Sequence, residues 1–190
     1  MKRVVLLLTV LFFSAGALMA QQDGLSKKEA KKAEKEVKRA AQDAEESALF
    51  AQAADALTER EFVLEADRIE FKRGQFVYVT PSTNFVSMHG QRATIQLAFN
   101  GVMSGPNGMG GITVEGSATN VTMNTDKKGN ITFSMMVQGT AVSANVTFRL
   151  TKGNNKCTAT VSPNFNSNRI SFTGTLYPES ESNVFKGRTL

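Results

Sequence analysis

The hydrophobic period of this 190-residue chain changes near Phe62. After that point apolar and polar residues alternate, which is typical of strands that bury one face of a sheet. The clearest examples are ATIQLAF (93–99), ANVTFRL (144–150) and KCTATV (156–161). Only short turn-forming sequences separate such segments, whereas parallel strands need crossovers of roughly a dozen residues or more. The pattern therefore predicts a mainly β domain with antiparallel strands.

We assign this β domain to residues 61–190 and expect roughly 8–10 strands in it. The further candidate strands are FVLEADRIEFK, QFVYVT, NFVSMHG, ITVEG, ATNVTMNT, NITFSMMVQ and RISFTGTLY. Turns are expected at Arg73-Gly74, Pro81-Ser82, 126–130 and 153–155. The pattern is compatible with either an antiparallel β-barrel or a β-sandwich. Only the tail after Tyr177 is expected to be a structureless segment.

Residues 21–60 differ in composition, being rich in Ala, Lys and Glu, and from Leu25 to Arg60 they contain no glycine or proline. Such a sequence favours one long α-helix before the β domain. Ser26 and Glu29 have the spacing of a capping box, which predicts that the helix begins near Ser26. The apolar stripe broadens toward the C-terminal half, so we expect only that half to dock on a core.

The charge of this predicted helix is unevenly distributed. Residues 27–39 contain seven basic and three acidic side chains, whereas residues 43–59 contain five acidic and no basic ones. One interpretation is a solvated helix face that keeps the protein soluble. The alternative is contact with an anionic envelope surface. The residues that would make this contact are Lys27, Lys28, Lys31, Lys32 and Lys35.

The first 20 residues have the order of a secretory signal peptide: basic Lys2 and Arg3, an apolar run, and small residues at the exit. Cleavage is expected after Ala20, with Ala17 as the alternative. An uncleaved anchor is the competing interpretation, but the apolar run is shorter than the roughly 20 residues of a spanning helix. No cysteine is available for lipid attachment near the exit. We therefore expect a secreted, periplasmic protein that is not a lipoprotein and has no transmembrane span after processing.

Composition also limits the chemistry of the mature chain. Cys157 is the only cysteine, so an intramolecular disulfide cannot form, and its alternation with apolar neighbours predicts a small core residue. Removal of Lys2 and Arg3 lowers the net charge from +5 to +3. That mild excess does not by itself predict a nucleic-acid partner, which is usually bound by a dense basic face with interleaved aromatic residues.

The glycine-rich stretch SGPNGMGGITVEG (104–116) resembles a phosphate-binding loop only superficially. Phosphate loops open a helix, whereas this one precedes an alternating strand pattern and lacks the Gly-Lys-Ser/Thr ending. We interpret it as a wide turn or bulge between strands ending near Phe99 and starting near Ile112. A glycine-rich rim can also approach a ligand closely. The candidate rim residues are Met103, Asn107, Met109 and His89.

The sequence predicts no catalytic residue, cofactor or metal site. His89 is the only histidine, and neither Gly-x-Ser-x-Gly nor His-x-x-x-His occurs. Glu65 and Asp67 would share one face of a regular strand, with Glu70 on the other. These carboxylates are expected to face solvent.

Two segments resemble a known family. IQLAFNGVMSGPNGMGGITVEG, following NFVSMHGQRA, is similar to a segment in which a Leu-Pro-Tyr-x-Gly-like strand end and a loop precede Gly-Gly-Ile-x-Phe. NRISFTGTL resembles the closing strand of the same family, Arg-x-x-Ile-Ser-Tyr-x-Gly. That family is the domain of unknown function 4251 of secreted Gram-negative bacterial proteins, and the similarity covers about Phe62 to Leu176.

The resemblance implies a signal peptide, a polar helix and a β domain, with no assigned activity. This chain departs from the motifs at Ala98 (proline in the family), Phe99 and Phe172 (tyrosine) and Val114 (phenylalanine). Loss of the two tyrosine hydroxyls puts a polar role for those positions in doubt and leaves the expected fold unchanged.

Three functional hypotheses follow. The first is a non-enzymatic periplasmic protein that binds a small ligand or an envelope partner through a barrel mouth or a sheet surface. The second is a structural or assembly protein whose basic helix contacts an anionic envelope surface. The third is a hydrolase of unrecognised type, with His89 as its best-placed general base.

Overall fold

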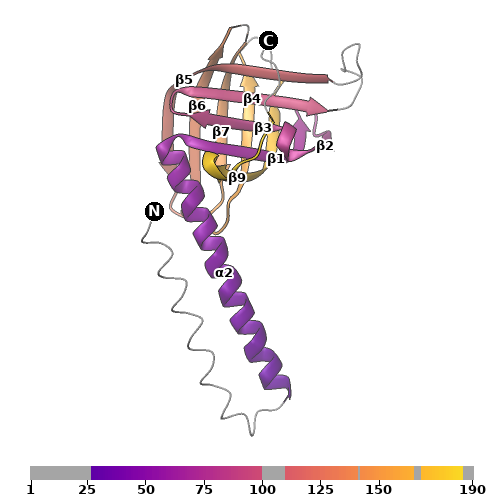
Figure 1. Cartoon of the computed structure of the whole chain (residues 1–190), viewed down its shortest axis with the longest axis vertical. Coiled ribbons are helices and arrows are strands. Elements are labelled where there is room, and N and C mark those ends of the chain that lie inside the picture. The colour runs from indigo at the N-terminus through magenta and orange to yellow at the C-terminus, as the bar shows by residue number, and fades with distance from the viewer. Residues whose placement is uncertain (1–26, 100–109, 141, 165–167, 186–190) are drawn as a thin grey trace. The chain divides into compact units, whose positions relative to one another are not determined.

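The computed structural model describes residues 27–99, 110–140, 142–164 and 168–185 (Figure 1). One helix, α2 (Lys27–Glu59), precedes the strands. The strands are β1 (Glu61–Phe71), β2 (Phe76–Tyr78), β3 (Phe85–His89), β4 (Arg92–Phe99), β5 (Gly110–Thr125), β6 (Ile131–Gly139), β7 (Ser143–Leu150), β8 (Lys156–Pro163) and β9 (Ile170–Pro178). Two short 3-10 helices, η1 (Pro81–Thr83) and η2 (Glu179–Glu181), complete the described elements. The predicted mainly β fold with one long N-terminal helix is confirmed.

The strands form one antiparallel sheet in the order β2-β1-β3-β4-β5-β6-β7-β8-β9, and β1 also pairs with β9. The β1–β9 pairing runs from Phe62↔Pro178 to Phe71↔Ile170 and closes the sheet. The result is an eight-stranded barrel to which β2 adds one short extra strand. The barrel alternative of the prediction is therefore the correct one, because closure leaves no second sheet to form a sandwich.

The barrel interior is filled with side chains. Phe62, Phe133 and Phe148 form a triangle of edge-to-face contacts, with ring centroids 5.4, 5.1 and 5.9 Å apart. All three are at most 1% exposed and lie in one buried cluster with residues from every barrel strand. Cys157 is a buried member of the same cluster, as its alternation predicted. The interior is thus an ordinary hydrophobic core.

The C-terminal part of α2 belongs to the compact unit Asp43–Leu190 that contains the barrel. Its buried residues Ala53, Ala56 and Leu57 join the interior cluster, whereas residues 31–45 are exposed. This difference confirms the expected division between a docking half and a solvated half. None of the helices in the described ranges is long and apolar enough to cross a membrane.

Strand β1 contains a bulge that the sequence pattern did not indicate. Its register against β9 shifts between Ala66 and Arg68, so Asp67 is the extra residue. Ile69 is fully buried, and the shift therefore turns Glu70 to the outer face, the same face as Glu65. The expected separation of these two carboxylates is wrong, because it assumed a regular strand.

Strand β5 also differs from expectation. The segments ITVEG and ATNVTMNT, predicted as separate strands, form one strand whose register against β6 shifts between Thr119 and Thr122. Asn120 adopts a left-handed conformation there, with φ of 51°. The pairing of β5 with β6 continues on both sides of this irregularity, so the two predicted segments form a single strand.

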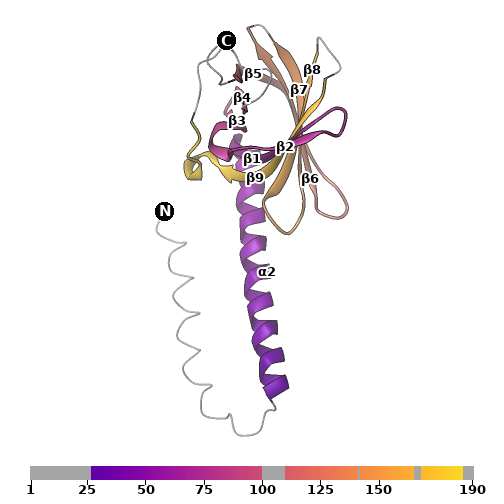
Figure 2. The same cartoon turned by 90° about the vertical axis from the view of Figure 1, so that its right-hand side faces the viewer.

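The tail after Tyr177 is ordered as far as Phe185, contrary to expectation. The Ser182 hydroxyl donates to the Glu65 carboxylate over 2.7 Å. At Phe185 the backbone N–H donates to the Ser82 carbonyl over 2.8 Å, and its carbonyl accepts from the buried Gln96 side chain over 2.7 Å. The segment 178–185 therefore crosses the outer face of β1, β3 and β4 as a strap (Figure 2).

Candidate functional site

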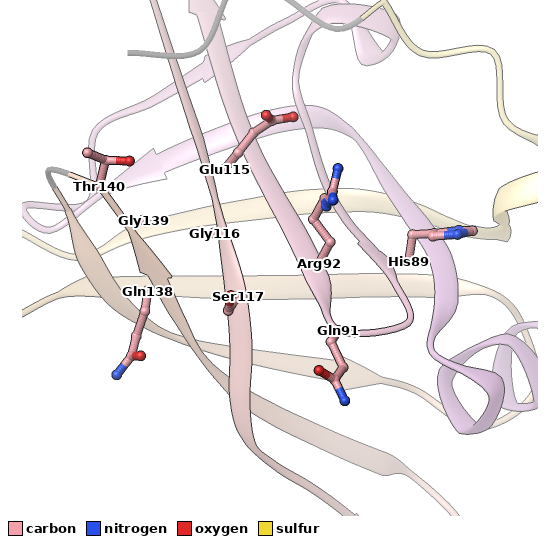
Figure 3. A pocket seen from close by; sticks show the side chains of 9 residues that line it. All are labelled: His89, Gln91, Arg92, Glu115, Gly116, Ser117, Gln138, Gly139 and Thr140. Carbon is pink, nitrogen blue, oxygen red and sulfur yellow. The ribbon is translucent and has the colours of Figure 1, made fainter.

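An open groove of about 740 Å³ lies on the outside of the barrel. Its walls come from the β3–β4 turn, the middle of β5 and the end of β6 (Figure 3). The lining residues are His89, Gln91, Arg92, Glu115, Gly116, Ser117, Gln138, Gly139 and Thr140. Apart from the two glycines, every lining residue is therefore polar or charged.

Two glycines shape the floor of this groove. Gly116 of β5 and Gly139 of β6 are register partners. A Cβ at Gly116 would collide with the Gln138 backbone, and one at Gly139 would lie 2.8 Å from the Glu115 carbonyl oxygen. Larger residues are excluded here because the two backbones approach closely.

The polar side chains of the groove are arranged by sheet register. Arg92, Ser117 and Gln138 are consecutive partners across β4, β5 and β6. In Figure 3 the Arg92 and Glu115 side chains extend in one direction of the view, whereas Gln91 and Gln138 extend in the other. Among the described residues no ion pair involves Arg92. Its guanidinium carries N–H donors that suit a hydrogen-bond acceptor of a ligand.

His89 joins the groove to the strap. Its Nδ1 lies 2.5 Å from Oε2 of Glu179 in η2, and both side chains are substantially exposed. The hydrogen bond to Glu179 and its negative charge raise the pKa of His89 above the ordinary 6.5, with a smaller contribution from Glu61 and an opposing one from Arg92. When His89 is protonated, its ion pair with Glu179 links this end of the strap to the rim of the groove.

The raised pKa of His89 predicts a pH-dependent strap. Stability that the pair contributes is present below pH 6.5 and is lost as the pH rises through the raised pKa of the folded protein. We expect the NMR titration of His89 to have a midpoint above 6.5, and Glu179→Gln to lower that midpoint. The amide signals of 179–185 should shift with the same midpoint in the wild type. Equal midpoints in wild type and variant would contradict the assignment of Glu179 as the cause.

The groove contains residue types found in hydrolases but not their arrangement. His89, Arg92 and Ser117 lie in one row, so His89 and Ser117 are two strands apart, about 9.5 Å at the usual strand spacing. A nucleophile and its base need hydrogen-bond contact. Burial raises the pKa of Cys157 to about 12, which disfavours a thiolate. Within the described ranges no three His, Cys, Asp or Glu side chains are grouped to hold a metal ion.

Only one of the predicted rim residues can be located. His89 lies in the groove, whereas Met103, Asn107 and Met109 fall outside the described residues. Sequence reasoning missed Arg92, Glu115 and Gln138, because they lie on three different strands and only strand pairing brings them to one groove. Gly116 and Gly139 offered the one usable signal, since isolated glycines in strands mark close approach of another backbone.

Comparison with known proteins assigns the chain to a family. The model of the domain of unknown function DUF4251 matches residues 44–176. A DUF4251 family protein from Bacteroides eggerthii DSM 20697, known from its crystal structure, is 44% identical with a TM-score of 0.66. The similarity covers 78% of this chain and 99% of that one. No curated protein matches. The family match begins inside α2, close to the start of the compact unit at Asp43. Because the match covers more than half of the residues, the chain belongs to the DUF4251 family.

Proposed function

We propose that this protein is an exported, non-enzymatic binding protein of the cell envelope. In this proposal the leader 1–20 directs it to the periplasm, and the outer groove binds a polar ligand or a polar segment of an envelope partner. The observation that carries the proposal is the contrast between a barrel interior packed with aromatic side chains and a polar groove outside it. A filled barrel favours binding on its surface.

The groove chemistry suggests the kind of group that binds. Arg92 offers a guanidinium, Gln91 and Gln138 offer amides, and Ser117 and Thr140 offer hydroxyls. Arginine recognises carboxylates through paired hydrogen bonds, and amides orient the neighbouring polar groups. We infer that the ligand carries a carboxylate next to hydroxyl or amide groups, as an acidic sugar or a peptide C-terminus does.

Titration of the mature protein with N-acetylmuramic acid, galacturonic acid oligomers and short peptides tests this inference. We expect at least one probe to shift the backbone amide signals of Arg92, Ser117 and Gln138 in NMR spectra. Arg92→Ala should weaken that binding at least tenfold, because one charge-assisted pair contributes about 1.5–3 kcal/mol. Arg92→Lys should keep part of it.

The matched control is Arg149→Ala, which removes an exposed arginine from β7, outside the groove lining. It should leave the affinity unchanged. Equal losses in Arg92→Ala and Arg149→Ala would mean that only net charge matters, and the groove proposal would fail. Conversion of any probe to product, with loss of turnover in His89→Ala, would instead support the hydrolase alternative.

A second candidate function rests on α2. Lys31, Lys32 and Lys35 are exposed, and Lys32 forms a weak surface pair with Glu36 at 4.0 Å. We propose that this basic part of the helix contacts an anionic envelope surface. Sedimentation with phosphatidylglycerol vesicles tests it: deletion of residues 21–39 should abolish association and leave the β domain folded. Association that survives the deletion would exclude this function.

A further inference from the structure

A second surface of the barrel, separate from the groove, has an unusual arrangement of outward side chains. Two neighbouring rows cross β2, β1, β9, β8, β7 and β6 in the register of the sheet. The first row is Tyr78, Arg68, Thr173, Thr158, Arg149 and Thr132, and the second is Phe76, Glu70, Ser171, Thr160, Thr147 and Ser134. Each row therefore begins at an aromatic ring and continues through mainly hydroxyl side chains.

The intervening row shows that both rows face outward. From β1 to β6 it consists of Ile69, Phe172, Ala159, Phe148 and Phe133, all at most 1% exposed and all in the core cluster, whereas its β2 member, Val77, is 38% exposed. Because successive side chains of a strand alternate between faces, the flanking rows lie on the outside. Figure 2 shows the strands β6, β7 and β8 that carry the hydroxyl part of this face.

The hydroxyl groups in these rows are held in position by one another. Ser134 donates to Thr147 over 3.2 Å, and the pairs Thr158 with Thr173 and Thr160 with Ser171 are each 3.4 Å apart. A hydroxyl has one donor and two acceptor positions, so each paired hydroxyl retains capacity for a ligand. Only Arg68, Glu70 and Arg149 carry charge among the twelve side chains of the two rows.

The aromatic end of the face is exposed although it is large and apolar. Phe76 is 53% and Tyr78 is 78% exposed. Their rings meet edge to face at 5.7 Å, and the Arg68 guanidinium lies over the Phe76 ring at 5.7 Å. Exposed apolar groups that are held in place and bordered by polar residues mark interaction sites.

We propose that this hydroxyl and aromatic face, defined by the two rows above, binds a neutral polysaccharide chain. A sugar ring presents an apolar C–H face that can stack on Phe76 or Tyr78, and an equatorial edge of hydroxyls that can bond to threonine and serine. Neighbouring strands place a polar side chain about every 4.7–4.9 Å along each row, close to the length of one sugar ring. The low charge favours a neutral glycan over an acidic polymer or a lipid surface. An apolar protein partner could not form hydrogen bonds with the hydroxyl groups of the two rows.

Affinity electrophoresis of the mature protein in gels containing soluble β-glucan, xylan, mannan or α-glucan tests this proposal. We expect at least one of these polysaccharides to retard the protein. Tyr78→Ala and Phe76→Ala should each weaken the retardation at least fivefold, and Thr158→Val with Thr160→Val should weaken it at least threefold. The side chains of Phe76 and Tyr78 are exposed, so these variants should remain folded, which circular dichroism checks.

Phe185→Ala is the matched control, since Phe185 is an aromatic residue of similar exposure, 73%, outside the two rows. It should leave the retardation unchanged. The proposal is overturned if none of the polysaccharides retards the folded protein, or if the Tyr78 and Phe76 variants behave like Phe185→Ala. It is also overturned if Tyr78 mediates only self-association or protein binding. The Arg92→Ala variant of the groove should retain full glycan binding, so failure of one proposal does not decide the other.

Discussion

Gly174→Val is expected to prevent closure of the barrel. Gly174 of β9 faces Ala66 at the bulge of β1, and a Cβ at this position would collide with the Glu65 carbonyl oxygen. The obstacle is backbone, so no rotamer change can relieve it, and the β1–β9 ladder would have to separate. We expect a loss of more than about 3 kcal/mol of unfolding free energy, at the upper end of overpacking effects. Urea denaturation followed by circular dichroism measures this loss.

Gly90→Ala is the control for a general effect of replacing glycine. Gly90 has φ of +60°, but a Cβ there has no atom within 4 Å. The cost should therefore be limited to backbone strain, about 1–2 kcal/mol. If Gly174→Val costs no more than Gly90→Ala, the close approach of β1 and β9 is not what requires glycine at residue 174.

Phe148→Ala is expected to have the other large effect. Phe148 is fully buried and contacts Phe62 and Phe133 edge to face at the centre of the core. Truncation leaves a cavity that the surrounding strands cannot fill, and the expected loss is about 3–5 kcal/mol. Phe148→Leu keeps most of the volume and should lose clearly less. Urea denaturation of the three proteins gives the comparison.

Phe76→Ala provides the matched control for this experiment. The exposed side chain of Phe76 should contribute within about 0.5 kcal/mol to unfolding free energy, as surface positions usually do. A loss for Phe148→Ala as small as for Phe76→Ala would contradict the packed interior. A loosely packed interior could hold a ligand, so this stability measurement also tests whether the barrel interior is a binding site.

Most strands could be predicted because apolar and polar residues alternate along them one by one, and the buried residues follow that alternation. Ile95, Leu97, Val146, Phe148, Ala159 and Val161, which were predicted to face inward, are all buried. The wrong strand predictions occur where a bulge or an irregular residue interrupts a strand, because a period-two pattern cannot reveal such a residue. Asp67 inserts into β1 and reverses the direction of Glu70, and the bend at Asn120 joins two predicted strands into one.

The groove could be predicted only in part. His89 attracted attention as the single histidine beside Gly90, and it does line the groove. Its partner Glu179 lies 90 positions away in a tail that was expected to be structureless, so no local signal could connect them. Arg92, Ser117 and Gln138 become neighbours only when β4, β5 and β6 pair in one register.

The amino-acid sequence by itself determined the helix, the antiparallel strands and the residues that face inward, because these depend on propensities and periods within one segment. The family motifs were equally local. The tertiary structure alone decided that the sheet closes through β1 and β9, that the tail crosses the outer face, and that polar side chains assemble into a groove and two rows. Those features depend on register between segments far apart in the chain. A one-residue bulge changes that register, and local periodicity contains no information about which strands will meet.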